Sequence, residues 1–266
     1  MTAPTDRTAP TGRTDVTDHH GPEGLPVRAT VVVVPGRGET RSTYARLGAR
    51  LAADAYRVRV VDAPDLDPGD PAGSLDRLGV RLAEAAATTA DDGAVRPVVW
   101  VGADTGAVAL AALLAREASE PEAAPDAVVL AGLPGHTATA AGGWDEELDV
   151  RTSCPVHRTR LTDDPQVRRG SLGDPVPDAL LDAAHGAGSG LPTLLLTGDA
   201  DPLADHEALL RAAKARPRAR LSVVRGAHHD VLNDTQHRAV AAEIVTFLEA
   251  LRNDLVPVVA VEASAW

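Results

Sequence analysis

An aspartate stands between two glycines in the stretch VVWVGADTGAVAL, residues 98 to 110. The spacing Gly102-x-Asp104-x-Gly106 is the frame G-x-S-x-G of a nucleophile elbow, with aspartate where serine is usual. Such an elbow presents its central side chain on a strained turn between a strand and a helix, and the small flanking residues avoid collisions. Asp104 is therefore a candidate nucleophile, although aspartate also suits the N-cap of a helix that begins near Thr105.

A carboxylate at this position changes the chemistry that the site can perform. Serine needs a base to remove its proton before attack, whereas an aspartate with a reference pKa of about 3.9 is already ionised at neutral pH. The adjacent start of a helix would favour the anion further. Attack on the carbon of an epoxide or a carbon–halogen bond gives an ordinary ester that activated water can cleave. Attack on an acyl carbon gives a much less stable anhydride, so Asp104 disfavours simple serine-esterase chemistry.

An acid and a base follow later in the chain. The acidic turn GDADP contains Asp199 and Asp201, and the stretch AHHDVLND contains His228 and His229. Nucleophile, acid and histidine each follow an apolar strand-like run, in the chain order of an α/β-hydrolase. From the residues alone, either aspartate can be the acid and either histidine can be the base. The earlier stretch PGRGE, residues 35 to 39, is glycine-rich, and its backbone N–H groups would suit an oxyanion hole.

The segments that would position these residues alternate between apolar strands and longer helical stretches. We expect strands at residues 29–35, 56–64, 97–102, 126–132, 193–198 and 220–226, most of them apolar throughout as buried parallel strands are. We expect helices at residues 43–55, 74–90, 106–118, 205–215 and 237–252. The alternation predicts an α/β fold with a mostly parallel central sheet and helices on both faces. Open sheets of this kind bind ligands beyond the carboxyl ends of their strands, where the candidate residues fall.

The chain reads as one α/β domain, residues 28–254, between two flanking segments. Its 266 residues suffice for one sizeable core and do not require two domains. Residues 1–27 are rich in Thr, Pro, Asp and Gly without an apolar run, which predicts a disordered leader and not a signal peptide. Residues 136–190 break the strand–helix rhythm with Gly pairs and prolines, so we expect a small cap or lid over the site. The apolar tail, residues 255–266, suits either an edge strand or a frayed end.

Composition argues against several functions and partners. The formal net charge of -12 at pH 7 argues against binding nucleic acid or an anionic membrane, because such partners need clustered positive charge. A single cysteine, Cys154, excludes an internal disulfide framework and a multi-cysteine metal site. The histidines lack metal-ligand spacing, and nothing in the chain requires a metal or an organic cofactor. No run approaches the roughly 18 apolar residues of a membrane span, so we expect a cytoplasmic protein with a small-molecule substrate. The sequence is compatible with a homodimer.

Nearly the whole of the expected domain resembles an α/β-hydrolase, on the strength of GRGE, YARLGARLAADAYRVRVVD, GDADP and HHDVLND. The resemblance is greatest to the small lysophospholipase- or monoacylglycerol-lipase-like hydrolases of actinobacteria. It implies a triad in which Asp104 takes the serine position, Asp201 is the acid and His229 is the base. It also implies that the backbone N–H groups of Arg37 and Thr105 are the oxyanion donors.

Within this superfamily, an elbow aspartate is known from epoxide hydrolases and haloalkane dehalogenases. Those enzymes commonly place tryptophan directly after the nucleophile, where this chain has Thr105. Epoxide hydrolases usually donate a proton from lid tyrosines, but Tyr44 and Tyr56 lie far before the expected cap. Within that cap, Trp144 and His157 are the candidate substrate-binding residues.

The residues favour a hydrolase in which Asp104 attacks an epoxide or carbon–halogen carbon and His229, held by Asp201, activates water. The first alternative is an ester or lactone hydrolase, and the second is a lyase or cyclase that uses Asp104 as an acid or base. The third is a non-catalytic binder on a hydrolase fold. Loss of activity should erode the whole constellation, but the acid, the histidine and the glycines are intact, which makes the binder the weakest alternative.

Overall fold

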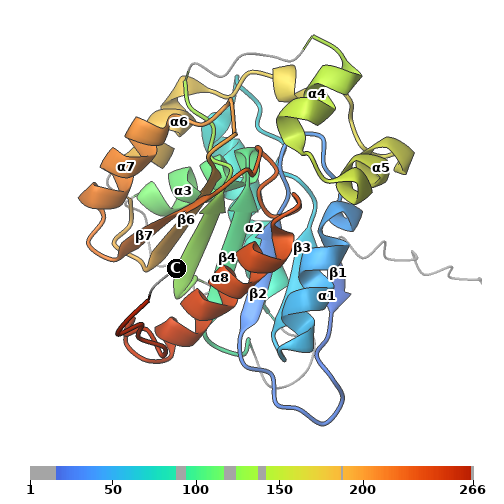
Figure 1. Ribbon diagram of the computed structural model, residues 1–266. Coiled ribbons are helices and arrows are strands. Elements are labelled where there is room, and N and C mark those ends of the chain that lie inside the picture. Colours follow the sequence, from blue (N-terminus) through green and yellow to red (C-terminus); the bar gives the residue numbers. More distant parts are fainter. Residues whose placement is uncertain (1–15, 88–93, 117–123, 137–141, 187, 265–266) are drawn as a thin grey trace, which may run out of the picture.

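A seven-stranded sheet in the order β1-β3-β2-β4-β5-β6-β7 runs through the centre of the protein (Figure 1). The computed structural model describes residues 16–87, 94–116, 124–136, 142–186 and 188–264. The strands are β1 (Val16–His19), β2 (Thr30–Val34), β3 (Arg57–Val61), β4 (Val98–Ala103), β5 (Ala127–Ala131), β6 (Thr193–Gly198) and β7 (Ala219–Val224). Every neighbouring pair is parallel except β1 with β3. The mostly parallel α/β sheet and its six expected strands are confirmed.

The seventh strand, β1, lies inside the segment that we expected to be a disordered leader. Val16 pairs with Val61 and His19 with Val58, in antiparallel register. The carboxylate of Asp18 also accepts hydrogen bonds from Arg59 of β3. The expectation is wrong for these residues, because strand pairing and an ion pair hold them at the sheet edge. Residues 1–15 of the expected leader lie outside the described residues.

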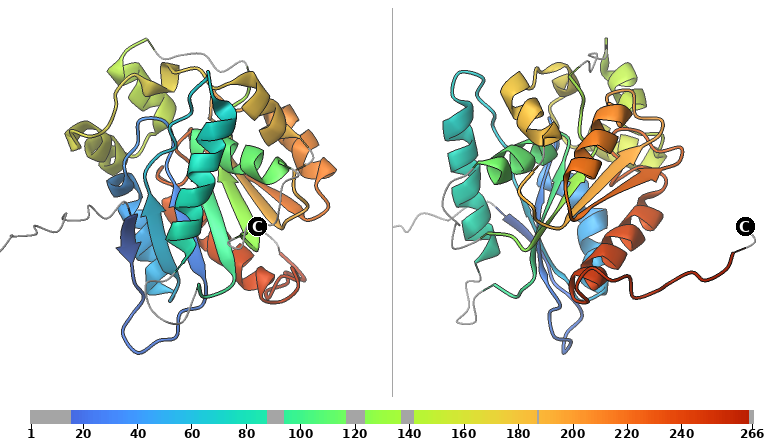
Figure 2. Two further views of the ribbon diagram at one scale, coloured as in Figure 1. Left: turned by 180° about the vertical axis from the view of Figure 1, so that it is seen from behind. Right: turned by 90° about the vertical axis from the view of Figure 1, so that its left-hand side faces the viewer.

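Helices cover both faces of the sheet, as expected (Figure 2). One face carries α1 (Ala45–Ala53) and α8 (His237–Leu251), and the other carries α2 (Pro71–Ala86), α3 (Thr105–Ala115), α6 (Asp178–His185) and α7 (His206–Ala215). Because strand side chains alternate, Val31 and Val33 of β2 face the first pair, whereas Val32 and Val34 face the second group. The valine-rich strands are thus covered on both sides.

Two short helices, α4 (Trp144–Arg151) and α5 (Pro155–Asp163), form a cap apart from the sheet (Figure 1). The 3-10 turn η2 (Ser171–Gly173) follows them, and η1 (Arg41–Tyr44) precedes α1. The expected cap, residues 136–190, is too wide, because the apolar side chains of α6 pack in the main core against α3. Residues 137–141 and 187 of that range lie outside the described residues.

The C-terminal tail runs away from the body of the protein (Figure 2). Its valines are exposed, and residues 255–264 form no strand, so the edge strand that we left open is absent from this described part of the tail. Among the helices of the described chain, none combines the length and the hydropathy needed to cross a membrane.

Candidate active site

Asp104 lies on a sharp turn between β4 and α3. Its backbone has φ 46° and ψ -120°, a left-handed conformation that costs a residue with a side chain about 1–3 kcal/mol. A Cβ on Gly102 would lie 2.6 Å from the nitrogen of Ala107, and a Cβ on Gly106 would lie 2.5 Å from the carbonyl oxygen of Val34. Neither glycine position therefore has room for a side chain. The Asp104 carboxylate caps no N–H of α3, so the turn presents it as an elbow presents a nucleophile.

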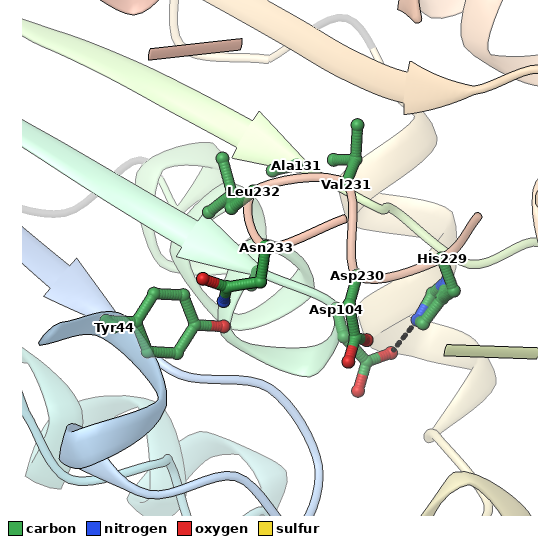
Figure 3. A pocket seen from close by; sticks show the side chains of 9 residues that line it. Tyr44, Asp104, Ala131, His229, Asp230, Val231, Leu232 and Asn233 are labelled. Carbon is green, nitrogen blue, oxygen red and sulfur yellow. Dashed lines mark hydrogen bonds and ion pairs between the residues drawn. The ribbon is translucent and has the colours of Figure 1, made fainter. Parts of the chain in front are cut away.

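Asp104, His229 and Asp201 form one chain of hydrogen bonds. His229 Nε2 lies 3.2 Å from Asp104 Oδ1, and His229 Nδ1 lies 3.0 Å from Asp201 Oδ2. The contact with Asp104 is drawn in Figure 3. All three side chains are buried. The structure thus brings the expected nucleophile, base and acid together.

The two competing residues are engaged elsewhere. Asp199 Oδ1 accepts a hydrogen bond from the N–H of Gly226 at 2.6 Å. His228 Nδ1 lies 3.0 Å from Asp234 Oδ2, which also accepts the N–H of His228 at 2.7 Å. The first contact joins the turns that follow β6 and β7, the second lies within one turn, and neither residue has a hydrogen bond to Asp104 in the described structure.

Burial and charge together set the protonation of the triad. Burial would lower the pKa of His229, but Asp201 and the hydrogen bonds to both aspartates raise it to about 10. Burial would raise the pKa of Asp104, but the Arg37 guanidinium and His229 hold it well below its usual range. At neutral pH His229 is therefore an imidazolium, and Asp104 is a carboxylate beside the Arg37 guanidinium.

Arg37 binds Asp104 with both its side chain and its backbone. Its Nε and Nη2 lie 2.8 Å from Oδ2 and Oδ1 respectively, and its backbone N–H donates to Oδ2 at 2.8 Å. Arg37 Nη1 donates to the carbonyl oxygens of Leu172 and Asp174, each at 2.9 Å. We expected only a backbone role for Arg37, because the stretch PGRGE does not show where a guanidinium will point. The side chain in fact links Asp104 to the segment that follows the cap helices.

A cavity of about 10 Å³ lies beside Asp104 and His229 (Figure 3). This volume accommodates about one water molecule. Its walls include Tyr44, Asp230 and Asn233. A substrate larger than a water molecule does not fit this cavity in its present form.

Tyr44 lies near Asp104, which its position before the cap in the chain did not lead us to expect. It lies far before the cap in sequence, but η1 places its ring in the wall of the same cavity as Asp104 (Figure 3). Its hydroxyl donates a hydrogen bond to Glu39 Oε2. Burial and the Glu39 carboxylate raise the pKa of Tyr44 well above its usual value, so the hydroxyl stays protonated.

A second group of buried charged side chains adjoins the triad. His157 Nε2 lies 2.8 Å from Asp230 Oδ2, and Arg151 Nη1 lies 3.5 Å from Asp230 Oδ1. Arg151 also bonds Glu147 Oε1 through Nε at 3.1 Å and Nη2 at 2.9 Å. Burial, followed by the charge of Asp230, raises the pKa of Glu39 to about 7. Sequence reasoning missed all of these residues except His157, because their types are common and their separations are long.

The remaining expected site residues lie in different places. Trp144 packs in the cap with Leu148, Leu161 and Val167 and does not line the cavity beside Asp104. His157 lies in the second charged group and not against the triad. Thr105 is the first residue of α3, where backbone N–H groups have no partner within the helix. The substrate-binding and oxyanion roles of these residues stay predictions.

Residues 31–243 match the sequence profile of the alpha/beta hydrolase family. A monoacylglycerol lipase from Paleococcus ferrophilus has a similar structure, with a TM-score of 0.67 and 17% identity over 89% of this chain and 98% of that one. A soluble variant of monoglyceride lipase from Saccharomyces cerevisiae has a TM-score of 0.67 and 16% identity, over 89% of this chain and 91% of that one. The enol-lactonase from Burkholderia xenovorans LB400 has a TM-score of 0.58 and 17% identity, over 88% of this chain and 96% of that one. The comparison with curated protein sequences finds no significant match. At these identities the solved structures establish the fold alone.

Proposed function

The chain belongs to the alpha/beta hydrolase family, and on this basis we propose that it hydrolyses an epoxide through a covalent ester on Asp104. The observation that carries this proposal is the continuous chain of hydrogen bonds from Asp104 through His229 to Asp201. An ester or lactone substrate is disfavoured, because attack by a carboxylate on an acyl carbon would give an anhydride.

The orientation of the Asp104 carboxylate supports a nucleophilic role. Oδ2 accepts the backbone N–H of Arg37, while Oδ1 faces His229. After attack by Oδ1, Oδ2 becomes the carbonyl oxygen of the ester. The N–H of Arg37 then stands where negative charge develops when water attacks that carbonyl, which is the requirement for an oxyanion donor.

The first step forms a bond between Asp104 Oδ1 and a ring carbon and breaks the carbon–oxygen bond of the epoxide. The ring oxygen takes the electron pair and receives the proton of the Tyr44 hydroxyl, which gives up its hydrogen bond to Glu39 for this step. Tyr44 lines the same cavity as Asp104. The imidazolium of His229 then returns a proton to Tyr44 through the water that the cavity can hold. Ester formation has by then removed one carboxylate that kept His229 protonated.

The second step regenerates the carboxylate. His229 takes a proton from water, and the oxygen of that water attacks Cγ of Asp104. The bond between Cγ and Oδ1 breaks, and the departing alkoxide takes the proton from His229. The new carboxyl group gives its proton to His229, which restores the resting site. The sum is one epoxide and one water converted to a vicinal diol.

Tyr44 favours an epoxide over a carbon–halogen substrate. An epoxide oxygen needs a proton as the ring opens, and a tyrosine hydroxyl can supply it. A departing halide needs N–H donors instead, but the described tryptophans, Trp100 in the core and Trp144 in the cap, do not line the cavity.

Entry of substrate requires a rearrangement that the contacts of Arg37 suggest. Its Nη2 donates a hydrogen bond to Asp104 Oδ1, and its Nη1 donates hydrogen bonds to the carbonyl oxygens of Leu172 and Asp174. Movement of the segment around η2 would draw the guanidinium away from Oδ1 and expose this oxygen to a substrate.

The same ion pair favours a second candidate, a non-catalytic protein on this fold. Both oxygens of Asp104 accept hydrogen bonds from Arg37, and the adjacent space holds about one water. A permanently closed pair of this kind would leave no room for a substrate.

A single turnover in water enriched in the heavy oxygen isotope separates the two candidates. The proposed hydrolase places one labelled oxygen in the peptide that contains Asp104, because solvent supplies an oxygen to the regenerated carboxylate. Turnover without label in that peptide would remove Asp104 as the nucleophile. Absence of turnover across a panel of aliphatic and aromatic epoxides would favour the non-catalytic candidate.

A further inference from the structure

Glu39, His157 and Asp230 come from distant parts of the chain and meet in the interior of the protein. Each offers one ligand atom, and these atoms lie within 4.8 Å of one another. The three residues are between 2% and 8% exposed. We infer that these side chains bind a divalent metal ion of the Zn²⁺ or Mn²⁺ type. One imidazole and two carboxylates form a ligand set that such ions accept.

The contact between His157 and Asp230 fits adjacent coordination positions. Nε2 of His157 and Oδ2 of Asp230 lie 2.8 Å apart. Two ligands bound at about 2.1 Å stand roughly 3.0 Å apart in neighbouring octahedral positions and roughly 3.4 Å apart in a tetrahedral site. An ion can therefore replace their direct hydrogen bond after the two atoms move apart by roughly 0.2–0.6 Å.

Glu39 supplies an independent observation, a buried carboxylate oxygen that lacks a partner. Its Oε2 accepts hydrogen bonds from the N–H of Gly36, at 2.8 Å, and from the hydroxyl of Tyr44. Its Oε1 is buried and has no hydrogen-bond partner among the residues that the structure describes. A buried acceptor without a partner costs about 1–3 kcal/mol, and more when it is charged. A metal ion would satisfy this oxygen while Oε2 keeps both of its donors.

The charge of the surrounding group also favours a cation. The positive charge of Arg151 is offset by Glu147, whose Oε1 it contacts at 2.9 Å. The carboxylates of Asp230 and Glu39 would neutralise a bound divalent ion, whose own charge favours the ionised form of Glu39. Arg151 faces Oδ1 of Asp230, at 3.5 Å, so Oδ2 is the oxygen available to an ion.

The three ligands are not members of the triad, and their binding of a metal can be measured without turnover, although Tyr44 and Asp230 bring both groups to the same cavity. None of the three ligands contacts Asp104 or Asp201 through a hydrogen bond in the described structure.

The test is metal binding by the full-length, untagged chain after removal of metals with a chelator. Calorimetric titration with ZnCl₂ and with MnCl₂ should show one equivalent bound by at least one of the two ions. Substitution of Co²⁺ should give the visible absorption bands of a coordinated ion. Glu39→Gln and His157→Gln should each weaken binding at least about 100-fold, since even the loss of an outer hydrogen-bond partner costs 10–100-fold.

Two matched variants control for surface binding and for general disturbance. Glu249 receives the hydroxyl of Tyr56 as Glu39 receives that of Tyr44, but it lies outside the group, so Glu249→Gln should bind metal as the parent does. His136, an exposed histidine beside Asp182, should tolerate His136→Gln equally.

The inference is overturned if the parent binds no stoichiometric metal, or if both ligand variants bind it as tightly as the parent. Circular dichroism reports whether each variant folds. Should Glu39→Gln fail to fold, His157→Gln decides the question alone.

Discussion

Arg37 Nη2 lies 2.8 Å from Asp104 Oδ1, the oxygen that also faces His229. The same guanidinium binds the carbonyl oxygens of Leu172 and Asp174. One side chain therefore joins the elbow to the segment that follows the cap helices. The stability of this ion pair and the reactivity of Asp104 depend on each other, and both can be measured.

Arg37→Met should destabilise the protein by about 3–5 kcal/mol, because it leaves a buried carboxylate without its main partner. Adding Asp104→Asn to that variant should recover part of the loss, since the remaining side chain is neutral. Urea unfolding of the parent, both single variants and the double variant gives the coupling energy. Additive losses would show that the pair is not energetically linked.

His229→Gln should trap the covalent ester, because ring opening needs Asp104 and Tyr44 whereas ester breakdown needs the base. Mass spectrometry of this variant after exposure to an epoxide should find one adduct on the peptide containing residue 104. The double variant with Asp104→Asn should show none. An adduct on another peptide would argue against the proposed nucleophile.

Asp104→Ser should create measurable hydrolysis of activated aryl esters, since serine would meet His229 and the freed N–H of Arg37. Adding His229→Gln should lower this activity by about 10²–10⁴-fold, the usual contribution of a general base. Complete inertness of Asp104→Ser, with folding intact, would favour the non-catalytic candidate.

Gly106→Ala should destabilise the protein by about 2 kcal/mol or more, because its Cβ would lie 2.5 Å from the carbonyl oxygen of Val34. Gly143→Ala is the matched control, since a Cβ there meets nothing within 4 Å. Its unfolding free energy should stay within about 0.5 kcal/mol of the parent. Equal effects of the two changes would mean that the elbow tolerates a side chain.

The lowered pKa of Asp234 predicts that the free energy of unfolding depends on pH. Burial would raise its pKa, but hydrogen bonds from the His228 N–H, the Thr152 hydroxyl and the Thr235 N–H lower it from 3.8 to about 2. A lowered folded-state pKa gives stability that is complete above about pH 4 and is lost as the pH falls towards 2. Asp234→Asn should therefore cost about 2 kcal/mol at pH 7 and progressively less below pH 4. Urea unfolding at pH 7 and pH 3 measures both values, and a pH-independent difference would contradict the assignment.

Local patterns in the chain were sufficient to predict the sheet, its covering helices and the elbow. Valine-rich runs such as the one around Val32 must be buried on both sides, and amphipathic runs such as the one around Leu47 must cover a sheet. Gly102 and Gly106 mark a turn in which no side chain fits. These properties depend on neighbouring residues alone, which is why they can be read without coordinates.

The choice between the two members of each candidate pair needed both the family resemblance and the structure. Asp199 and Asp201 occupy the same turn, as do His228 and His229, so the residues themselves did not separate them. Neighbouring positions of a turn point their side chains in different directions, so each meets different partners. Only the fold shows that the second member of each pair joins the chain of hydrogen bonds.

The sequence by itself determined the α/β architecture and the presence of a carboxylate at the elbow. The tertiary structure alone decided that the Arg37 guanidinium holds that carboxylate, that Tyr44 shares its cavity, and that Glu39, His157 and Asp230 meet. The physical reason is the range of the forces involved. Strands, helices and glycine turns follow from local sterics and hydrophobic periodicity, whereas contacts between distant side chains depend on how the loops and the cap pack.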